Sequence, residues 1–118
     1  MDEIDKLLLS LSKTKFRGSF HLNDKMKEYV INNGIDKIKK DTIEIINKRI
    51  KIKQLNDGKQ TPMKQVHPTF IAQHATGTCC RSCLKRIHKI DDDKELSQKE
   101  IEYITDVIVR WINMEMYK

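Results

Sequence analysis

Residues 56–88 read NDGKQTPMKQVHPTFIAQHATGTCCRSCLKRIH and hold all three cysteines of the chain, three of its four histidines and both of its prolines. Two of the four glycines lie in the same segment. Cysteine and histidine are the side chains that zinc prefers as ligands, whereas proline and glycine mark the starts and ends of helices. The segment therefore predicts both a break between helical parts of the chain and the place where its chemistry lies.

The residues before this segment have the pattern of amphipathic helices. Apolar side chains recur at helical spacing over residues 2–13 and again over residues 35–53. Between these ranges, Asn23 can cap a further helix that Gly34 ends. The many β-branched residues toward the end of 35–53 leave a strand there as an alternative.

The segment itself and the residues after it predict three more helices. Pro68 fits the first position of a short helix that Gly77 ends, and a second short helix is expected over residues 79–88. Ser97 and Glu100 form an S-x-x-E capping box, which predicts the closing helix.

A chain of 118 residues is long enough for one hydrophobic core. We therefore predict a mainly α, compact single domain over residues 1–118 with about five to six helices. It divides into a basic helical half (1–55), a central Cys/His-rich segment (56–90) and a C-terminal helix (91–118).

The sequence contains no run of apolar residues that approaches the ~18 needed for a membrane-spanning helix. Its first residues are acidic, whereas a secretory signal begins with positive charges. We expect a cytoplasmic protein with no membrane partner and with reduced thiols.

The charge of the chain is uneven. Residues 1–64 carry 15 Lys and Arg against 9 Asp and Glu, whereas residues 65–118 carry 8 of each. Such a surplus predicts a phosphate-bearing partner, either nucleic acid or a small molecule. The alternative is that the lysine-rich helix faces are simply solvated. The sequence does not indicate an oligomeric state.

The cysteines offer a metal site. Cys80 and Cys83 form a C-x-x-C motif, His88 lies five residues further on, and His74 lies upstream. These four side chains could complete a tetrahedral zinc site, with iron as the alternative metal. On one continuous helix Cys83 and His88 would point about 140° apart, so the four ligands converge only if the chain turns near Gly77 and again near His88.

The same thiols allow three other interpretations. In a redox site, Cys80 and Cys83 would cycle between dithiol and disulfide. In a nucleophilic enzyme, Cys79 or Cys80 would attack a substrate with His67 or His74 as the base, which makes His67, His74 and Cys79 the catalytic candidates. In the plainest interpretation, Cys79 and Cys83 are small buried apolar residues on one helix face.

Seven polar side chains are candidates for binding a phosphate or a nucleotide, because they supply cations, amides and a hydroxyl. They are Arg17, Lys59, Gln60, Thr61, Gln73, Arg81 and Lys85. Lys59, Gln73 and Arg81 would line one pocket with His67 and His74 if the loop at 56–62 folds back onto the two short helices. An ordinary surface turn is the alternative for this loop.

Four motifs carry a resemblance to a known family. They are SKTKFRGSF at 12–20, NDGKQTPM at 56–63, HPTFIAQHATGTCCRSCL at 67–84 and LSQKEIEYI at 96–104. With these motifs the chain resembles the bacterial and phage family catalogued as domain of unknown function 4186, over nearly its whole length. It departs from the family pattern at Ile87, where tryptophan is usual, and at residues 89–91, where Gly-Ile-Pro is usual. The resemblance implies no established activity.

Two classes of function follow from these residues. We favour a small basic zinc-binding module that binds nucleic acid or a nucleotide or phosphate ligand, because residues 58–90 contain no Asp or Glu to act as the general base of a zinc hydrolase. The alternative is a metal- or cysteine-dependent enzyme that acts on a nucleotide or nucleic acid. A phage or plasmid anti-defence protein that binds a host effector or signal is a further alternative.

Overall fold

The computed structural model describes residues 1–118 as six α-helices and one 3₁₀ helix, with no strand. The elements are α1 (Glu3–Ser12), η1 (Arg17–Ser19), α2 (Asp24–Asn33), α3 (Ile35–Arg49), α4 (Pro68–Thr76), α5 (Arg81–His88) and α6 (Gln98–Met116). The mainly α prediction is confirmed. The alternative of a strand at the end of 35–53 is wrong, because the helix there ends at Arg49 and Ile50 is its C-cap.

Local capping signals set most of the helix boundaries. Asn23 accepts a hydrogen bond from the backbone N–H of Met26, and Ser97 and Glu100 form both bonds of the predicted capping box. Three side-chain caps were not predicted. Asp2 caps α1 by accepting the backbone N–H of Asp5. His67 caps α4 through its Nδ1, and Cys80 caps α5 through its sulfur.

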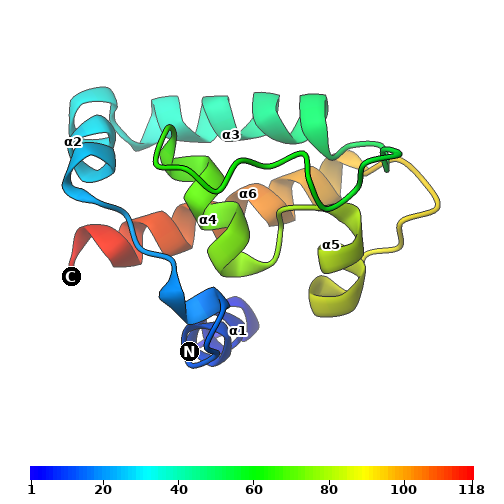
Figure 1. The fold of residues 1–118 in the computed structure, drawn as a ribbon, viewed down its shortest axis with the longest axis horizontal. Helices are drawn as coiled ribbons and strands as arrows, with labels where there is room; N and C mark the ends of the chain where they lie inside the picture. Colours follow the sequence, from blue (N-terminus) through cyan, green and yellow to red (C-terminus); the bar gives the residue numbers. More distant parts are fainter.

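The long helices α3 and α6 pack against each other and run in opposite directions along the long axis of the molecule (Figure 1). The short helix α4 packs against both of them and against α1, α2 and η1. It is therefore the central element, and α5 lies beside it toward one end of the molecule (Figure 1).

The central position of α4 explains its burial. Every residue from 68 to 81 is buried, including the whole of α4 and the turn into α5. Apolar residues such as Ile71, Ala72 and Ala75 join the main core, which also takes in Ile104 and Ile108 of α6. The polar residues in the same run lie inside the protein as well, so each of them needs a hydrogen-bonding partner there.

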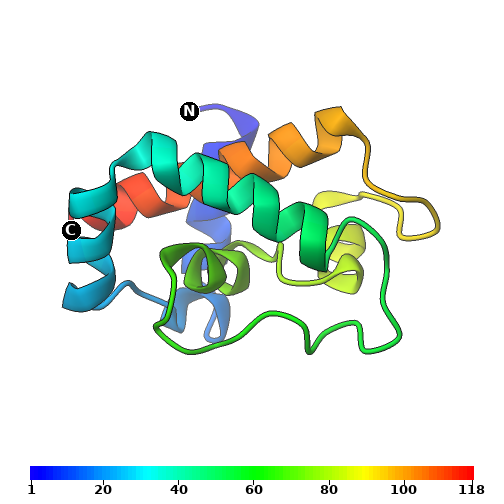
Figure 2. The same cartoon turned by 90° about the horizontal axis from the view of Figure 1, so that it is seen from above.

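A long connection returns the chain from α3 to α4. Residues 50–67 leave the end of α3 and run back along the molecule as an extended loop before α4 begins (Figure 2). On its way the loop contacts α5 through Asp57 and α2 through Gln65. None of the helices combines the length and the apolar character that crossing a membrane would need.

Candidate metal centre

The turn between α4 and α5 brings the three cysteines together. Gly77 ends α4 in the left-handed conformation with φ 72°, and a Cβ there would lie 2.4 Å from Cδ1 of Ile87. Glycine is therefore required at this position on two counts. After the turn, Cys80 adopts an extended backbone and its sulfur accepts the N–H of Cys83 at 3.4 Å, which starts α5.

The sulfurs of Cys79, Cys80 and Cys83 all lie within 4.8 Å of one another, and those of Cys79 and Cys83 are 3.7 Å apart. Tetrahedral zinc with zinc–sulfur bonds of about 2.3 Å separates its sulfurs by about 3.8 Å. The three side chains are buried, with exposed fractions of 7%, 3% and 9%. These three cysteines could therefore hold a metal ion.

Arg17 of η1 lies against this cluster. Its Nη1 donates to the carbonyl oxygen of His74 at 2.7 Å and to the sulfur of Cys79 at 3.6 Å, and its Nη2 donates to the sulfur of Cys83 at 3.2 Å. Arg86 of α5 adds a longer contact of 3.9 Å from its Nη2 to the sulfur of Cys83. Two guanidinium groups therefore face the thiols.

The three thiols differ in their acidity. The thiols of Cys79 and Cys80 and the guanidinium of Arg17 hydrogen-bond the sulfur of Cys83 and hold the pKa of Cys83 far below its ordinary value, although burial acts in the opposite direction. Hydrogen bonding to the other two sulfurs, together with burial, raises the pKa of Cys79. Of the three thiols, Cys83 is therefore the one that loses its proton most readily.

The two histidines of the predicted zinc site lie outside this group. Nε2 of His74 is 3.0 Å from the carbonyl oxygen of Thr61, and the ring stacks on Phe20. The ring of His88 lies between the carbonyl oxygen of Thr76 (2.8 Å) and the hydroxyl of Tyr103 (2.9 Å). Burial lowers the pKa of both imidazoles.

The structure thus brings together two of the four predicted ligands, Cys80 and Cys83, and adds Cys79. His74 and His88 are not brought to the sulfurs, because each donates a ring N–H to a backbone carbonyl that would otherwise be buried without a partner. The direction of α5 contributes to this result, since His88 is the last residue of that helix and Cys83 lies in its first turn.

No histidine hydrogen-bonds a cysteine sulfur, so the base and the nucleophile of the predicted cysteine enzyme are not paired. His67 accepts the N–H of Thr69 through Nδ1 and lies 3.1 Å from a carboxylate oxygen of Asp41 through Nε2. Its two ring nitrogens are therefore occupied by capping α4 and by tying α4 to α3.

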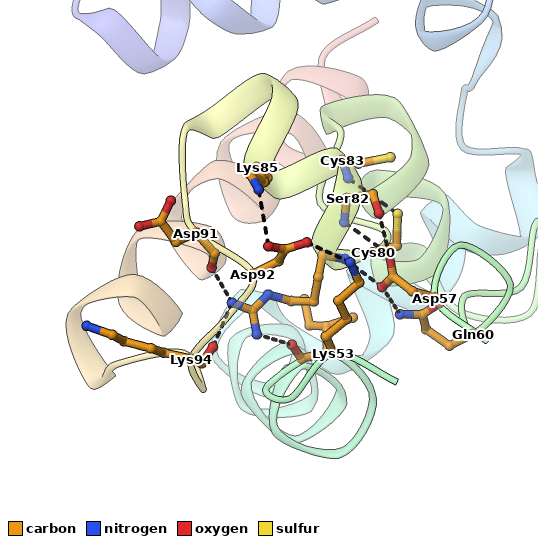
Figure 3. Close-up of polar contacts among 12 residues, drawn as sticks. Lys53, Asp57, Gln60, Cys80, Ser82, Cys83, Lys85, Asp91, Asp92 and Lys94 are labelled. Carbon is orange, nitrogen blue, oxygen red and sulfur yellow. Dashed lines mark hydrogen bonds and ion pairs between the residues drawn. The ribbon is translucent and has the colours of Figure 1, made fainter. Parts of the chain in front are cut away.

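The loop predicted to bind phosphate is folded onto the start of α5. The carboxylate of Asp57 accepts the backbone N–H groups of Arg81 (2.9 Å) and Ser82 (3.1 Å) and the hydroxyl of Ser82 (2.7 Å), and the Gln60 amide donates to it as well (Figure 3). Burial acts to raise the pKa of Asp57, but these hydrogen bonds outweigh it and lower the pKa. A carboxylate of the chain thus occupies the place where an anion would bind at this helix end.

Arg81 is fully buried and also has a structural position. Its guanidinium donates to the carbonyl oxygens of Ile50, Lys51, Asp91 and Lys94 at 2.6–3.4 Å. It thereby joins the end of α3 to the connection between α5 and α6. No acidic side chain is among its partners.

The remaining predicted ligand-binding residues are divided between the interior and the surface. Thr61 donates its hydroxyl to the carbonyl oxygen of Cys79, and the Gln73 amide donates to the carbonyl oxygen of Thr78. Lys85 is exposed and bonds Asp92, and Lys59 is exposed on the loop. The pocket expected between this loop and the two short helices is not formed, because none of the cavities is lined by Lys59, His67, Gln73, His74 or Arg81.

The sequence carries a signal for the third thiol, because all three cysteines occur within five residues as C-C-x-x-C. The prediction from spacing nevertheless placed Cys79 only as a nucleophile or a core residue. Arg86 was also missed, although it lies three residues after Cys83 on α5 and helical spacing could have indicated this contact. Asp57 was missed for a different reason, since its contacts with the start of α5 depend on tertiary folding.

Comparison with known proteins gives one result for the sequence and one for the fold. A family model described as "Domain of unknown function (DUF4186)" matches residues 5–113 of the 118. The match includes the whole of the cysteine cluster and Arg17. No solved structure matches the chain.

Proposed function

Because the chain belongs to the DUF4186 family, a domain of unknown function, we propose its function from its own residues: the protein is a metal-binding module that holds one divalent ion, zinc in the first instance, on Cys79, Cys80 and Cys83. The observation that supports this proposal is the approach of three buried sulfurs to within 4.8 Å of one another. Thiolates favour zinc and other soft or borderline ions over magnesium and calcium.

The charge of Arg17 supports the same proposal. Three thiolates and a divalent cation leave one net negative charge in a buried site, and such a charge needs a cationic partner. Arg17 supplies it and donates N–H groups to two of the three sulfurs. Hydrogen bonds of this kind orient metal ligands and tune the metal that they hold.

The number of cysteines favours zinc over an iron–sulfur cluster. A cluster of the common types uses four cysteines, and this chain has three. If the metal analysis finds one iron ion per chain, iron takes the place of zinc on the same thiolates.

The test measures metal in untagged protein by elemental mass spectrometry. We expect about one zinc per chain in the wild type and a loss of most of it in the Cys79→Ser variant. The matched variant is His88→Gln, which changes a residue of the ligand set predicted from sequence and leaves the three thiols in place. Zinc retained in Cys79→Ser and lost in His88→Gln would reject the three-cysteine site in favour of the His74, Cys80, Cys83 and His88 set.

A second function, contact with a polyanion such as nucleic acid, is supported by the free lysines of α3. Lys39, Lys40 and Lys48 are exposed and their ammonium groups make no hydrogen bond to the chain, whereas Lys85 is paired with Asp92. The lysine-rich helix therefore offers three unpaired cations, whereas the loop at 56–62 offers one, Lys59.

Binding of duplex DNA at several salt concentrations tests this second function. Replacing Lys39, Lys40 and Lys48 by Gln should weaken binding and lower the slope of log K against log salt, by about 0.9 for each phosphate that the variant no longer neutralises. Lys59→Ala serves as the control. If Lys59→Ala loses as much DNA affinity as the lysine variant of α3, the loop at 56–62 also contacts the DNA.

A further inference from the structure

The cysteine cluster offers a metal three ligands, and the chain supplies no fourth. His74 and His88 donate to backbone carbonyls, and the carboxylate of Asp57 is engaged at the start of α5. Zinc with three protein ligands keeps its fourth position for a water molecule or another exogenous ligand, whereas a closed structural site uses four. The arrangement of the three thiols is thus that of an open site.

Arg17 and Arg86 lie on the side of the cluster from which an exogenous ligand can arrive. Cys80 turns its sulfur to a backbone N–H of α5 and is 3% exposed. The sulfurs of Cys79 and Cys83 instead meet the guanidinium groups, of which Arg17 is half-buried and Arg86 is exposed. A ligand that reaches the cluster from solvent therefore meets positive charge.

We propose that the fourth position of the metal takes a small monoanion from solution, held by the metal and by the guanidinium of Arg86. This inference rests on the proposed metal site. A thiolate, or another anion that coordinates through a single atom, has the required chemistry.

The charges of the site favour a monoanion as the ligand. A divalent ion, three thiolates, one monoanion and the guanidinium groups of Arg17 and Arg86 together carry no net charge. Arg17 already balances the metal and the three thiolates, so a monoanion would pair with the charge of the exposed Arg86. A dianion would leave a negative charge beside the buried thiolates.

Arg86 has the free donors that the ligand needs. A guanidinium offers five N–H groups, and the only hydrogen bond that the Arg86 guanidinium donates within the chain is the long one to the sulfur of Cys83. Arg17, in contrast, already donates to a carbonyl oxygen and two sulfurs. The exposed arginine is therefore the group that contacts the bound anion.

The experiment replaces zinc by cobalt(II), whose visible absorption reports its ligands, and titrates the loaded protein with thiocyanate. We expect a saturable shift of the cobalt bands. The Arg86→Gln variant should weaken thiocyanate binding by about 3- to 10-fold, because it removes a partly screened, charge-assisted hydrogen bond. Lys85→Gln is the matched control: it removes one exposed positive charge from the adjacent residue, which bonds Asp92 and no sulfur, and should leave binding within about 2-fold.

The outcomes separate this inference from the metal site on which it rests. Cobalt bands that thiocyanate does not change would overturn the open position and leave the metal site standing. Equal thiocyanate binding by Arg86→Gln and Lys85→Gln would overturn the role of Arg86. Failure of the wild type to bind cobalt at the cysteines would overturn both proposals.

Discussion

Arg17 and Arg81 are both arginines with guanidinium groups turned into the protein, and both were predicted from sequence to bind an anion. Arg81 donates to four backbone carbonyl oxygens and is fully buried. Arg17 donates to one carbonyl oxygen and to the sulfurs of Cys79 and Cys83, and it is half-buried. The two differ in what accepts their hydrogen bonds.

This difference separates a structural arginine from one at a site. Backbone carbonyls keep the same charge under all conditions, so Arg81 fixes the geometry of the chain segments around it. The acceptors of Arg17 include thiols, which can lose protons and bind metals. A change at Arg17 should therefore alter the chemistry of the cysteines, whereas a change at Arg81 should alter folding.

The largest expected effect is that of Arg81→Met. The variant leaves four inward-facing carbonyl oxygens without their donor, which should lower the free energy of unfolding by about 3 kcal/mol or more. Urea denaturation of the metal-free protein measures this loss. A loss of less than about 1 kcal/mol in the free energy of unfolding would contradict the structural role of Arg81. The two arginines would then not differ in the way that their acceptors suggest.

Cys83→Ser should have the next largest effect, and only where metal is present. With zinc in excess of its dissociation constant, the wild type should melt about 5–10 °C above the variant, because a bound ion stabilises the folded state by mass action. In a chelator such as EDTA most of this difference should disappear. An equal difference with and without zinc would show that Cys83 serves packing and not a metal.

Arg17→Gln tests the other side of the comparison. Removing a group that donates to metal ligands should weaken zinc binding by about 10-fold or more, while the metal-free protein should lose only about 1–2 kcal/mol of stability. Competition with a chromophoric chelator gives the first quantity and urea denaturation the second. A large loss of stability with unchanged zinc affinity would make Arg17 an arginine of the same kind as Arg81.

The helices could be predicted from the sequence because their signals are local. The Asn23 cap, the Ser97 capping box and the Gly77 terminator each act within four residues of their own position, and each is found in the structure. Periodicity did not give the end of α3, which stops at Arg49 although apolar residues continue beyond it. The turn at Gly77 was predictable in place, but the helix predicted over residues 79–88 begins only at Arg81, so Cys79 and Cys80 lie in the turn before it.

The composition of the candidate site was harder to predict because it depends on contacts between distant residues. Sequence spacing brings His74 and His88 near the cysteines but does not tell that each ring meets a carbonyl 12 or 13 residues away. In the same way, Arg17 hydrogen-bonds His74 and Cys83, which lie 57 and 66 positions further along the chain. Only the arrangement of η1 against α4 brings Arg17 there.

Asp57 offers the smallest and most specific test, because it stabilises the start of the same short helix without belonging to the cysteine cluster. Its folded pKa is lowered below the ordinary 3.8, since hydrogen bonds from Ser82, Arg81 and Gln60 outweigh burial. The stabilisation is therefore complete above about pH 4 and is lost as the pH falls through the folded pKa.

Asp57→Asn should lower the free energy of unfolding by about 1 kcal/mol or less near pH 7, because solvent partly screens this carboxylate. The gap in this free energy between the variant and the wild type should close in acid. Urea denaturation from pH 7 to pH 3 in EDTA measures that gap without any contribution from bound zinc. A gap that stays constant over this range would assign the effect of Asp57 to the shape of its side chain and not to the charge of its carboxylate.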